Sequence, residues 1–210
     1  MKTNKIKTQN ELQQIFKNST LYLKPGSTIT YKGNLILGNN IEFSGINIFG
    51  IGNKINSNCQ IMNVKLGINN TILSNSIIQD SEIKNDNSIG PFCFLRQHNI
   101  IGSNNNFGTF VEIKKSKIDD HNKMAHNIFL GDCEIKSQNI IGAGVITANY
   151  DKGKHHKCKI GNKVFIGCNS TIISPVKIEN NVIIAAGSKI NFDLKKDTKI
   201  IQKNTNYFTK

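Results

Sequence analysis

The sequence lacks the segments that carry a protein into or across a membrane. No uninterrupted apolar run approaches the about 20 residues that a membrane-spanning helix needs. The first eight residues are basic, but residues 9–11 are polar, whereas a secretory signal continues with an apolar stretch and a small-residue cleavage site. We therefore expect a soluble, cytoplasmic protein without a membrane partner.

Paired cysteines are also missing. The five cysteines are odd in number and show no CxxC spacing, so the sequence indicates neither a disulfide framework nor a zinc site. We expect all five to be reduced, half-buried thiols in the wall of the fold, and we predict no metal site. They are Cys59, Cys93, Cys133, Cys158 and Cys168.

Acidic and aromatic residues are scarce. The chain has 14 Asp and Glu against 27 Lys and Arg, and its formal net charge of +13 suits an anionic partner such as nucleic acid, a membrane surface or a phosphorylated small molecule. The lysines are scattered, so a general compositional bias explains the charge equally well. Aromatic residues make up only 7% of the chain, which leaves few to stack on bases, and no nucleic-acid-binding module is recognisable. We expect no nucleic-acid partner.

A six-residue repeat of aliphatic side chains dominates what the sequence does contain. Neither an α-helix nor an isolated amphipathic strand has this period. Shorter groups with the same step lie upstream, and the frame slips by one residue between them. In the last third the repeat runs without a break through Ile160, Ile166, Ile172, Ile178, Ile184 and Ile190.

Glycine often follows the repeated aliphatic residue, as in Ile141-Gly142 and Ile166-Gly167. Glycine lets the chain turn where a side chain would collide or would need a positive φ. Short strands joined at such corners, each with one inward aliphatic side chain, predict an all-β fold, a parallel β-helix of hexapeptide repeats. Three hexapeptides complete a triangular coil, so about 160 residues give roughly nine coils about 4.8 Å apart. The period alone does not fix the handedness.

The two ends differ from this repeat. Apolar residues at Leu12, Ile15 and Phe16 have helical spacing, so we expect a short amphipathic helix packed on the first coil. We divide the chain into an N-terminal helical segment (residues 1–20), a β-helix domain (21–192) and a basic C-terminal tail (193–210). A polar stretch near residues 148–159 interrupts the repeat and predicts a protruding loop, where functional residues are often found.

Several multi-residue motifs occur in the order and spacing of one family. Together they resemble the C-terminal acetyltransferase domain of the bifunctional UDP-N-acetylglucosamine pyrophosphorylase/glucosamine-1-phosphate N-acetyltransferase, a hexapeptide-repeat acyltransferase, over about residues 20–203. The resemblance implies a left-handed β-helix, a homotrimer whose sites lie between subunits, and acetyl-CoA as co-substrate. The motifs are Gly90-Pro91-Phe92, Leu95-Arg96, Phe110-Val111-Glu112-Ile113-Lys114, Ala125-His126, Leu130-Gly131-Asp132, Ile141-Gly142-Ala143-Gly144, Asn149-Tyr150-Asp151 and Val164-Phe165-Ile166-Gly167.

The resemblance also implies roles for individual residues. His126 stands at the position of the family's catalytic histidine, and an imidazole is suited to take the proton of the attacking amine. Glu112 is a candidate to orient that ring. Arg96 and Lys114 match positions that hold the sugar phosphate, where Arg offers a two-pronged fork and Lys a point charge. The positions that bind acetyl-CoA are Ala143, Asn149, Tyr150, Cys168, Ala186 and Lys203, of which Cys168 and Lys203 replace a Ser and an Arg of the family.

Two positions depart from the family on the acceptor side. Phe129 replaces a Tyr and Ile140 replaces an Asn. His155 also stands where the family has a Lys. Losing one such hydrogen bond costs about 0.5–1.5 kcal/mol, so the first two changes together could weaken acceptor binding by one or two orders of magnitude.

These observations give one preferred function and two alternatives. The preferred function is transfer of an acetyl group from acetyl-CoA to the amine of glucosamine-1-phosphate, in UDP-N-acetylglucosamine and peptidoglycan precursor synthesis. The sequence shows no Gly-rich nucleotide loop near its start, so we expect no pyrophosphorylase activity and a separate uridylyltransferase. The alternatives are an acetyltransferase for another amino sugar and a catalytically decayed trimeric scaffold.

Overall fold

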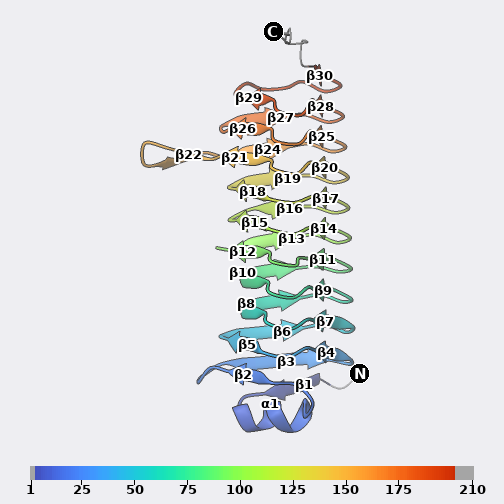
Figure 1. Cartoon of the computed structure of the whole chain (residues 1–210), viewed down its shortest axis with the longest axis vertical. Coiled ribbons are helices and arrows are strands. Elements are labelled where there is room, and N and C mark those ends of the chain that lie inside the picture. Colours follow the sequence, from blue (N-terminus) through green and yellow to red (C-terminus); the bar gives the residue numbers. More distant parts are fainter. Residues whose placement is uncertain (1–2, 202–210) are drawn as a thin grey trace, which may run out of the picture.

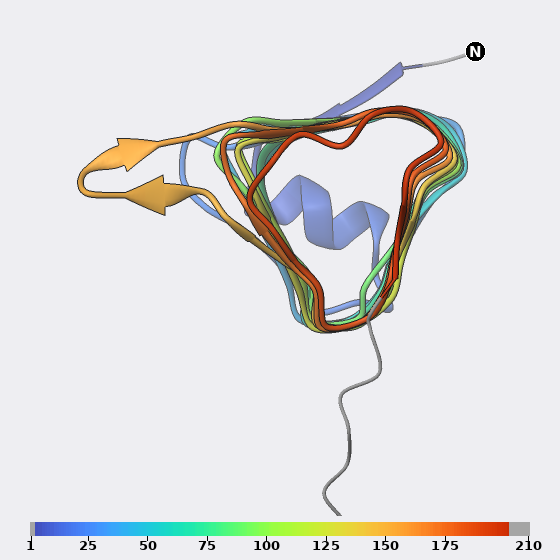
Figure 2. The same ribbon diagram turned by 90° about the horizontal axis from the view of Figure 1, so that it is seen from above.

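A parallel β-helix forms the body of the protein. The computed structural model describes residues 3–201. The strands stack in ten coils, counted along the ten-stranded sheet that makes one side, and they outline a triangular prism (Figures 1 and 2). Strands in successive coils pair in parallel, so each side of the prism is a ladder that runs the length of the molecule.

Each of the three faces takes about one strand from every coil. Face 1 consists of β2 (Leu21–Leu23), β5 (Ile41–Ser44), the first parts of β8 (Gln60–Leu66) and β10 (Ile77–Ile83), β12 (Phe94–Arg96), β15 (Val111–Lys114), β18 (Ile128–Gly131), β21 (Ile146–Ala148), β26 (Thr171–Ile173) and β29 (Lys189–Ile190). Face 2 consists of β3 (Thr28–Lys32), β6 (Ile46–Phe49), the second parts of β8 and β10, β13 (Asn99–Ile101), β16 (Lys117–Ile118), β19 (Cys133–Ile135), β24 (Cys158–Ile160) and β27 (Val176–Ile178). Face 3 consists of β4 (Leu35–Leu37), β7 (Asn53–Ile55), β9 (Thr71–Ile72), β11 (Ser88–Ile89), β14 (Asn106–Phe107), β17 (Lys123–Met124), β20 (Ile140–Ile141), β25 (Phe165–Ile166), β28 (Ile183–Ile184) and β30 (Lys199–Ile200).

The repeated aliphatic side chains fill the interior of the prism. All six isoleucines of the last-third repeat are at most 2% exposed. They stack between coils, since Ile141 pairs with Ile166 and Ile166 with Ile184. Burying one such side chain contributes about 1.5–3 kcal/mol, so these columns are the main source of stability. The predicted hexapeptide-repeat β-helix is confirmed, with ten coils where roughly nine were expected.

The glycines that follow the aliphatic residues are needed mainly for close approach between coils. A Cβ on Gly142 would lie 2.7 Å from the backbone nitrogen of Cys168 in the next coil, and one on Gly167 would collide with the backbone of Ala186. Neither glycine has a positive φ. The left-handed backbone conformation is instead adopted two residues later, for example by Gly144 (φ 72°) and Asn169 (φ 56°).

Buried asparagines line the corner between faces 2 and 3. Each side-chain oxygen except the last accepts a hydrogen bond from the backbone N–H of the next asparagine, as Asn122 Oδ1 does from Asn139 (3.0 Å). These bonds satisfy backbone donors at a corner where strand pairing is interrupted. The ladder comprises Asn53, Asn70, Asn87, Asn105, Asn122 and Asn139, each at most 2% exposed.

The N-terminal segment closes one end of the prism. β1 (Thr3–Ile6) pairs antiparallel with β3, along the edge of the first coil. α1 (Gln9–Ile15) lies across the open end of the interior (Figure 2). Leu12 on this helix is completely buried. The predicted N-terminal helix is confirmed, whereas the antiparallel strand before it was not predicted.

Side chains at the start of α1 hold this cap in place. Thr8 and Glu11 form a capping box that satisfies the first N–H groups of the helix. The Gln9 amide bonds to the free edge of β2, where its Nε2 donates to the Leu21 carbonyl (2.7 Å) and its Oε1 accepts from the Leu23 N–H (2.7 Å). Gln9 thus takes the place of a neighbouring strand.

Strand pairing continues beyond residue 192, where we predicted the end of the β-helix domain. Leu194 is 2% exposed and bridges to Ile178, and β30 pairs in parallel with β28. Leu194 follows Ile190 after four residues and not six, so the six-residue period does not include it. The rest of the predicted tail, including Lys203, lies outside the described residues. No helix within residues 3–201 is both long and apolar enough to cross a membrane.

The predicted loop is present, and it is an ordered hairpin. β22 (Tyr150–Asp151) and β23 (Lys154–His155) pair antiparallel and project from the corner between faces 1 and 2 (Figures 1 and 2). The two residues at its tip, Lys152 (φ 44°) and Gly153 (φ 83°), both have the positive φ that tight hairpin turns favour. We call this corner the loop corner.

Candidate active site

Four of the predicted site residues form a column along the corner between faces 3 and 1. His126, Ala143, Cys168 and Ala186 each occupy the second position after a face 3 strand, in four successive coils. Backbone hydrogen bonds tie the corner together, from Gly144 N–H to His126 O (2.9 Å) and on through the next coils. Neighbouring strands lie about 4.8 Å apart, so the column is about 14 Å long. We call it the His126 column.

The His126 imidazole lies exposed at the lower end of this column. It packs beside Gly108, where a Cβ would come within 3.1 Å of Nδ1. Within residues 3–201 no hydrogen bond holds the ring. Within one chain the Glu112 carboxylate binds another side chain and not this ring, so the expectation that Glu112 orients the ring stays a prediction.

Glu112 is paired with Arg96. Both Arg96 Nε (2.8 Å) and Nη2 (2.6 Å) reach Glu112 Oε1 across adjacent coils of face 1. The guanidinium also lies over the Phe94 ring, 5.4 Å from its centre. Lys114 is the strand partner of Arg96, so the two predicted phosphate-binding residues lie side by side. Two cations with one carboxylate leave a net positive site that suits an anion.

The predicted coenzyme residues Asn149 and Tyr150 lie at the base of the hairpin, one coil above Asp132. Asn149 is 6% exposed, and its Nδ2 donates to Asp132 Oδ2 (2.6 Å). His155 Nδ1 lies 2.9 Å from the same oxygen. The Tyr150 and His155 rings pack at 5.2 Å between centres, and Tyr150 is 62% exposed. Asp132 belongs to the motif Leu130-Gly131-Asp132, and the sequence alone predicts no role for it.

The predicted site residues therefore gather at the two opposite edges of face 1. His126 is level with Thr109, five residues before Lys114, so the two edges are about 15 Å apart along the strands. Phe129 lies between them, half-buried on face 1, as the strand partner of Glu112. Ile140 lies on face 3 and is 49% exposed. One chain does not bring the base and the phosphate-binding pair together.

The cysteines differ in accessibility, contrary to the expectation that all five are half-buried. Cys168 in the His126 column is exposed, whereas the other four are buried. Burial raises the pKa of the Cys93 thiol to about 11. The pKa of Cys158 is raised by its hydrogen bond with Cys133 and by burial. Cys168 is therefore the accessible thiol among the five.

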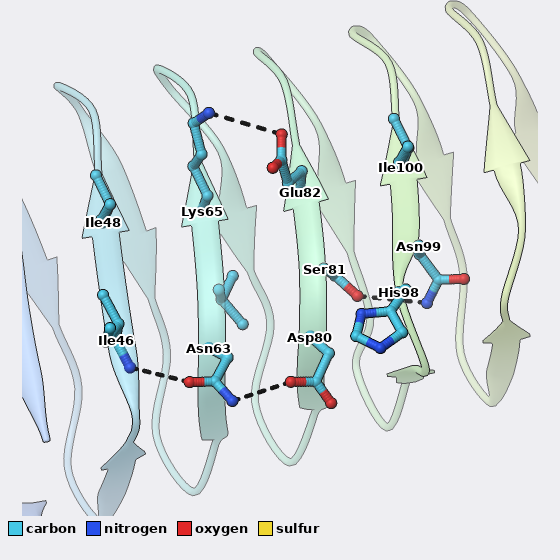
Figure 3. A pocket seen from close by; sticks show the side chains of 11 residues that line it. Ile46, Ile48, Asn63, Lys65, Asp80, Ser81, Glu82, His98, Asn99 and Ile100 are labelled. Carbon is cyan, nitrogen blue, oxygen red and sulfur yellow. Dashed lines mark hydrogen bonds and ion pairs between the residues drawn. The ribbon is translucent and has the colours of Figure 1, made fainter.

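A separate hollow lies on face 2. Its volume is about 560 Å³, and Figure 3 shows apolar walls from Ile46, Ile48 and Ile100 with Lys65 and Glu82 between them. Lys65 and Glu82 pair at 3.6 Å, and both are largely exposed. None of the predicted site residues lines this hollow. Within residues 3–201 no group of three or more His, Cys, Asp or Glu side chains is placed to hold a metal ion.

Comparison with known proteins connects this geometry to a family. Residues 157–191 match the bacterial transferase hexapeptide family (six repeats). The chain is 41% identical over 163 residues to bifunctional protein GlmU of Clostridium botulinum (strain Kyoto / Type A2), covering 78% of this chain and 34% of the relative. It is 37% identical over 191 residues to bifunctional protein GlmU of Clostridium kluyveri (strain NBRC 12016), covering 89% of this chain and 40% of the relative. The chain thus spans little more than a third of these relatives, and over that length the resemblance to them is confirmed.

Solved structures share the fold. UDP-N-acetylglucosamine O-acyltransferase (LpxA) from Moraxella catarrhalis superposes with a TM-score of 0.59 at 19% identity, covering 76% of this chain and 66% of that one. LpxA from Acinetobacter baumannii gives a TM-score of 0.52 at 20% identity, covering 84% of this chain and 67% of that one. The predicted left-handed parallel β-helix is confirmed by these likenesses.

Proposed function

We propose that this chain, a hexapeptide-repeat homologue of the bifunctional GlmU proteins, transfers an acetyl group from acetyl-CoA to the amine of glucosamine-1-phosphate. The reaction serves UDP-N-acetylglucosamine synthesis, and the chain itself supplies no pyrophosphorylase activity. The observation that carries the proposal is the His126 column. A predicted base and three predicted coenzyme positions, separated by up to 60 residues in sequence, fall on one line of the fold.

The residues divide the chemistry between them. Arg96 and Lys114 hold the phosphate of the acceptor, and the Glu112 carboxylate fixes the Arg96 fork for it. The acceptor amine attacks the thioester carbon, the C–N bond forms and the C–S bond breaks. His126 takes the proton from the amine and returns it to the departing thiolate, so coenzyme A leaves as the thiol. The column above His126 offers small side chains at Ala143 and Ala186 on which the pantetheine arm can lie.

The separation of about 15 Å between the two edges leads us to propose a homotrimer in which a second subunit completes each site. Exposed apolar side chains flank the His126 column in the same coils. Ile140, Phe165 and Ile183 form a stripe on face 3, each 42–49% exposed, and Ile146 (46%) and Ile173 (39%) lie on face 1. Apolar surface of this kind favours contact between subunits.

A second acceptor is favoured by the apolar side chains at Phe129 and Ile140. Neither can donate or accept the hydrogen bonds that a tyrosine and an asparagine would give a hydroxylated sugar. An amino sugar with an apolar substituent would suit these positions better.

Turnover tests the proposal. Purified protein is incubated with acetyl-CoA and glucosamine-1-phosphate, beside a panel of other amino sugars, and released coenzyme A is measured by chromatography. We expect His126→Asn to lower kcat by about 10²–10⁴-fold, because the general base is lost. The control is His121→Asn, at a distant corner where φ is 60° and asparagine is well tolerated. Activity with another amino sugar alone would move the assignment to that acceptor, and no activity at all would leave a decayed scaffold.

A further inference from the structure

Asp132 is a buried carboxylate that joins three parts of the chain. Its side chain is 5% exposed, at a corner position with φ 53°. Oδ2 accepts a hydrogen bond from Asn149 Nδ2 (2.6 Å) and lies 2.9 Å from His155 Nδ1, while Lys115 Nζ lies 3.8 Å from Oδ1. A buried charge is costly unless it is hydrogen-bonded, so losing any of these contacts would raise the cost of burying the Asp132 carboxylate.

The backbone of Asp132 is fixed from both sides. Its N–H donates to the Lys114 carbonyl (3.0 Å) in the coil below, and its carbonyl accepts from the Cys158 N–H (3.2 Å) where the hairpin rejoins the coil above. The His156 N–H closes the hairpin base on the Asn149 carbonyl (2.8 Å). Asp132 therefore links the phosphate-binding strand to the hairpin base through rigid contacts.

The chemistry of a carboxylate determines how Asn149 is oriented. An ionised carboxylate only accepts hydrogen bonds, so Asn149 must turn its NH₂ group toward Asp132 and its carbonyl oxygen away. That oxygen has no hydrogen-bond partner within residues 3–201, and it is not among the fully buried unsatisfied atoms of the described residues. It is available to accept a hydrogen bond from a ligand N–H.

We propose that Asp132 is a positioning residue that sets the amide orientation of Asn149, so that Asn149 Oδ1 accepts an amide N–H of the coenzyme's pantetheine arm. This inference rests on the proposed function. A neutral side chain at position 132 no longer dictates which end of the Asn149 amide faces it. The pantetheine arm then meets the donor end for part of the time and loses its hydrogen bond.

Coenzyme A binding, measured by titration calorimetry on the full chain, tests the inference. Asp132→Asn keeps the shape and suits the positive φ, and we expect it to raise the Kd for coenzyme A by about 2–10-fold, the range for one lost hydrogen bond. Asn149→Ala should raise the Kd by at least as much. In the Asn149→Ala background, Asp132→Asn should have no further effect, because the two changes remove the same contact. Lys115→Gln removes the Lys115 contact of Asp132 without touching the hairpin rings, and should leave the Kd unchanged.

The outcomes separate the inference from the proposed function. Wild-type protein that binds no coenzyme A would overturn the proposed function itself. Wild-type binding with an unchanged Kd in Asn149→Ala, or with additive effects in the double variant, would overturn the inference alone. A rise in the Kd for Lys115→Gln equal to that for Asp132→Asn would show that any change around Asp132 weakens binding, and would also overturn it.

Discussion

Replacing one asparagine of the buried ladder with alanine should destabilise the protein several times more than replacing an exposed asparagine with alanine. In Asn122→Ala, the buried N–H and Nδ2 groups of Asn139 lose their acceptor, Asn122 Oδ1, at 3.0 and 2.9 Å. The carbonyl of Asp119 loses the Nδ2 donor at 3.1 Å, and Asn105 Oδ1 loses the same donor at 3.1 Å. An orphaned buried polar group costs about 1–3 kcal/mol.

We expect a loss of about 3 kcal/mol, because Asn139 N–H has no other acceptor, while Asn139 Nδ2 and Asn105 Oδ1 each keep another hydrogen bond. For a chain of this length, 1 kcal/mol lowers the melting temperature by about 2–4 °C, so Asn122→Ala should melt about 6–12 °C below the wild type. Thermal unfolding is followed by circular dichroism at one fixed protein concentration, since the stability of an oligomer depends on it.

The matched control is Asn106→Ala on the outward side of β14. Asn106 is exposed, and we expect a change within about 0.5 kcal/mol. If Asn122→Ala melted within about 2 °C of this control, the hydrogen bonds of the ladder would contribute nothing net, and the reasoning would be refuted.

Two further predictions concern the proposed site. In native protein a maleimide should modify Cys168 rapidly and the four buried thiols only after unfolding, and acetyl-CoA should slow the modification of Cys168. Mass spectrometry of the labelled peptides measures both effects. Labelling of Cys168 that is unaffected by acetyl-CoA would place the coenzyme elsewhere. Phe129→Tyr and Ile140→Asn should each lower the KM for glucosamine-1-phosphate by about 2–10-fold, because each restores one hydrogen-bonding group. An unchanged KM in steady-state kinetics would instead favour a different acceptor.

The body of the fold was predictable because every coil meets the same physical demand. An inward aliphatic side chain is needed at each turn of the prism, so the isoleucine repeat revealed the architecture without knowledge of any long-range contact. The elements that escaped prediction do not share this period. β1 has four residues and pairs antiparallel, and Leu194 comes four residues after Ile190.

The site was predictable as a set of positions, but its contacts were not. The hexapeptide period places His126, Ala143, Cys168 and Ala186 at equivalent corners, so their alignment follows from the repeat once the frame is known. Which acid pairs with which base depends on side-chain reach between coils. No sequence pattern predicts that Glu112 pairs with Arg96.

The partner of Asp132 could not have been read from the sequence either. Asp132 meets Asn149, which lies 17 residues further along the chain, and His155 reaches Asp132 only because the hairpin folds back on its own base. The chain leaves the repeat over the hairpin, so the hexapeptide frame carries no information about that contact.

The cap at the N-terminal end has a consequence for how copies of this protein can associate. A stack of parallel coils exposes unpaired N–H and C=O groups at its end, and a second molecule could continue the ladder there and grow a filament head to tail. Here an antiparallel strand occupies the β3 edge, the Gln9 amide occupies the β2 edge, and α1 covers the apolar interior. Head-to-tail growth needs this end to be open, so we expect one helix, one strand and one amide together to block it.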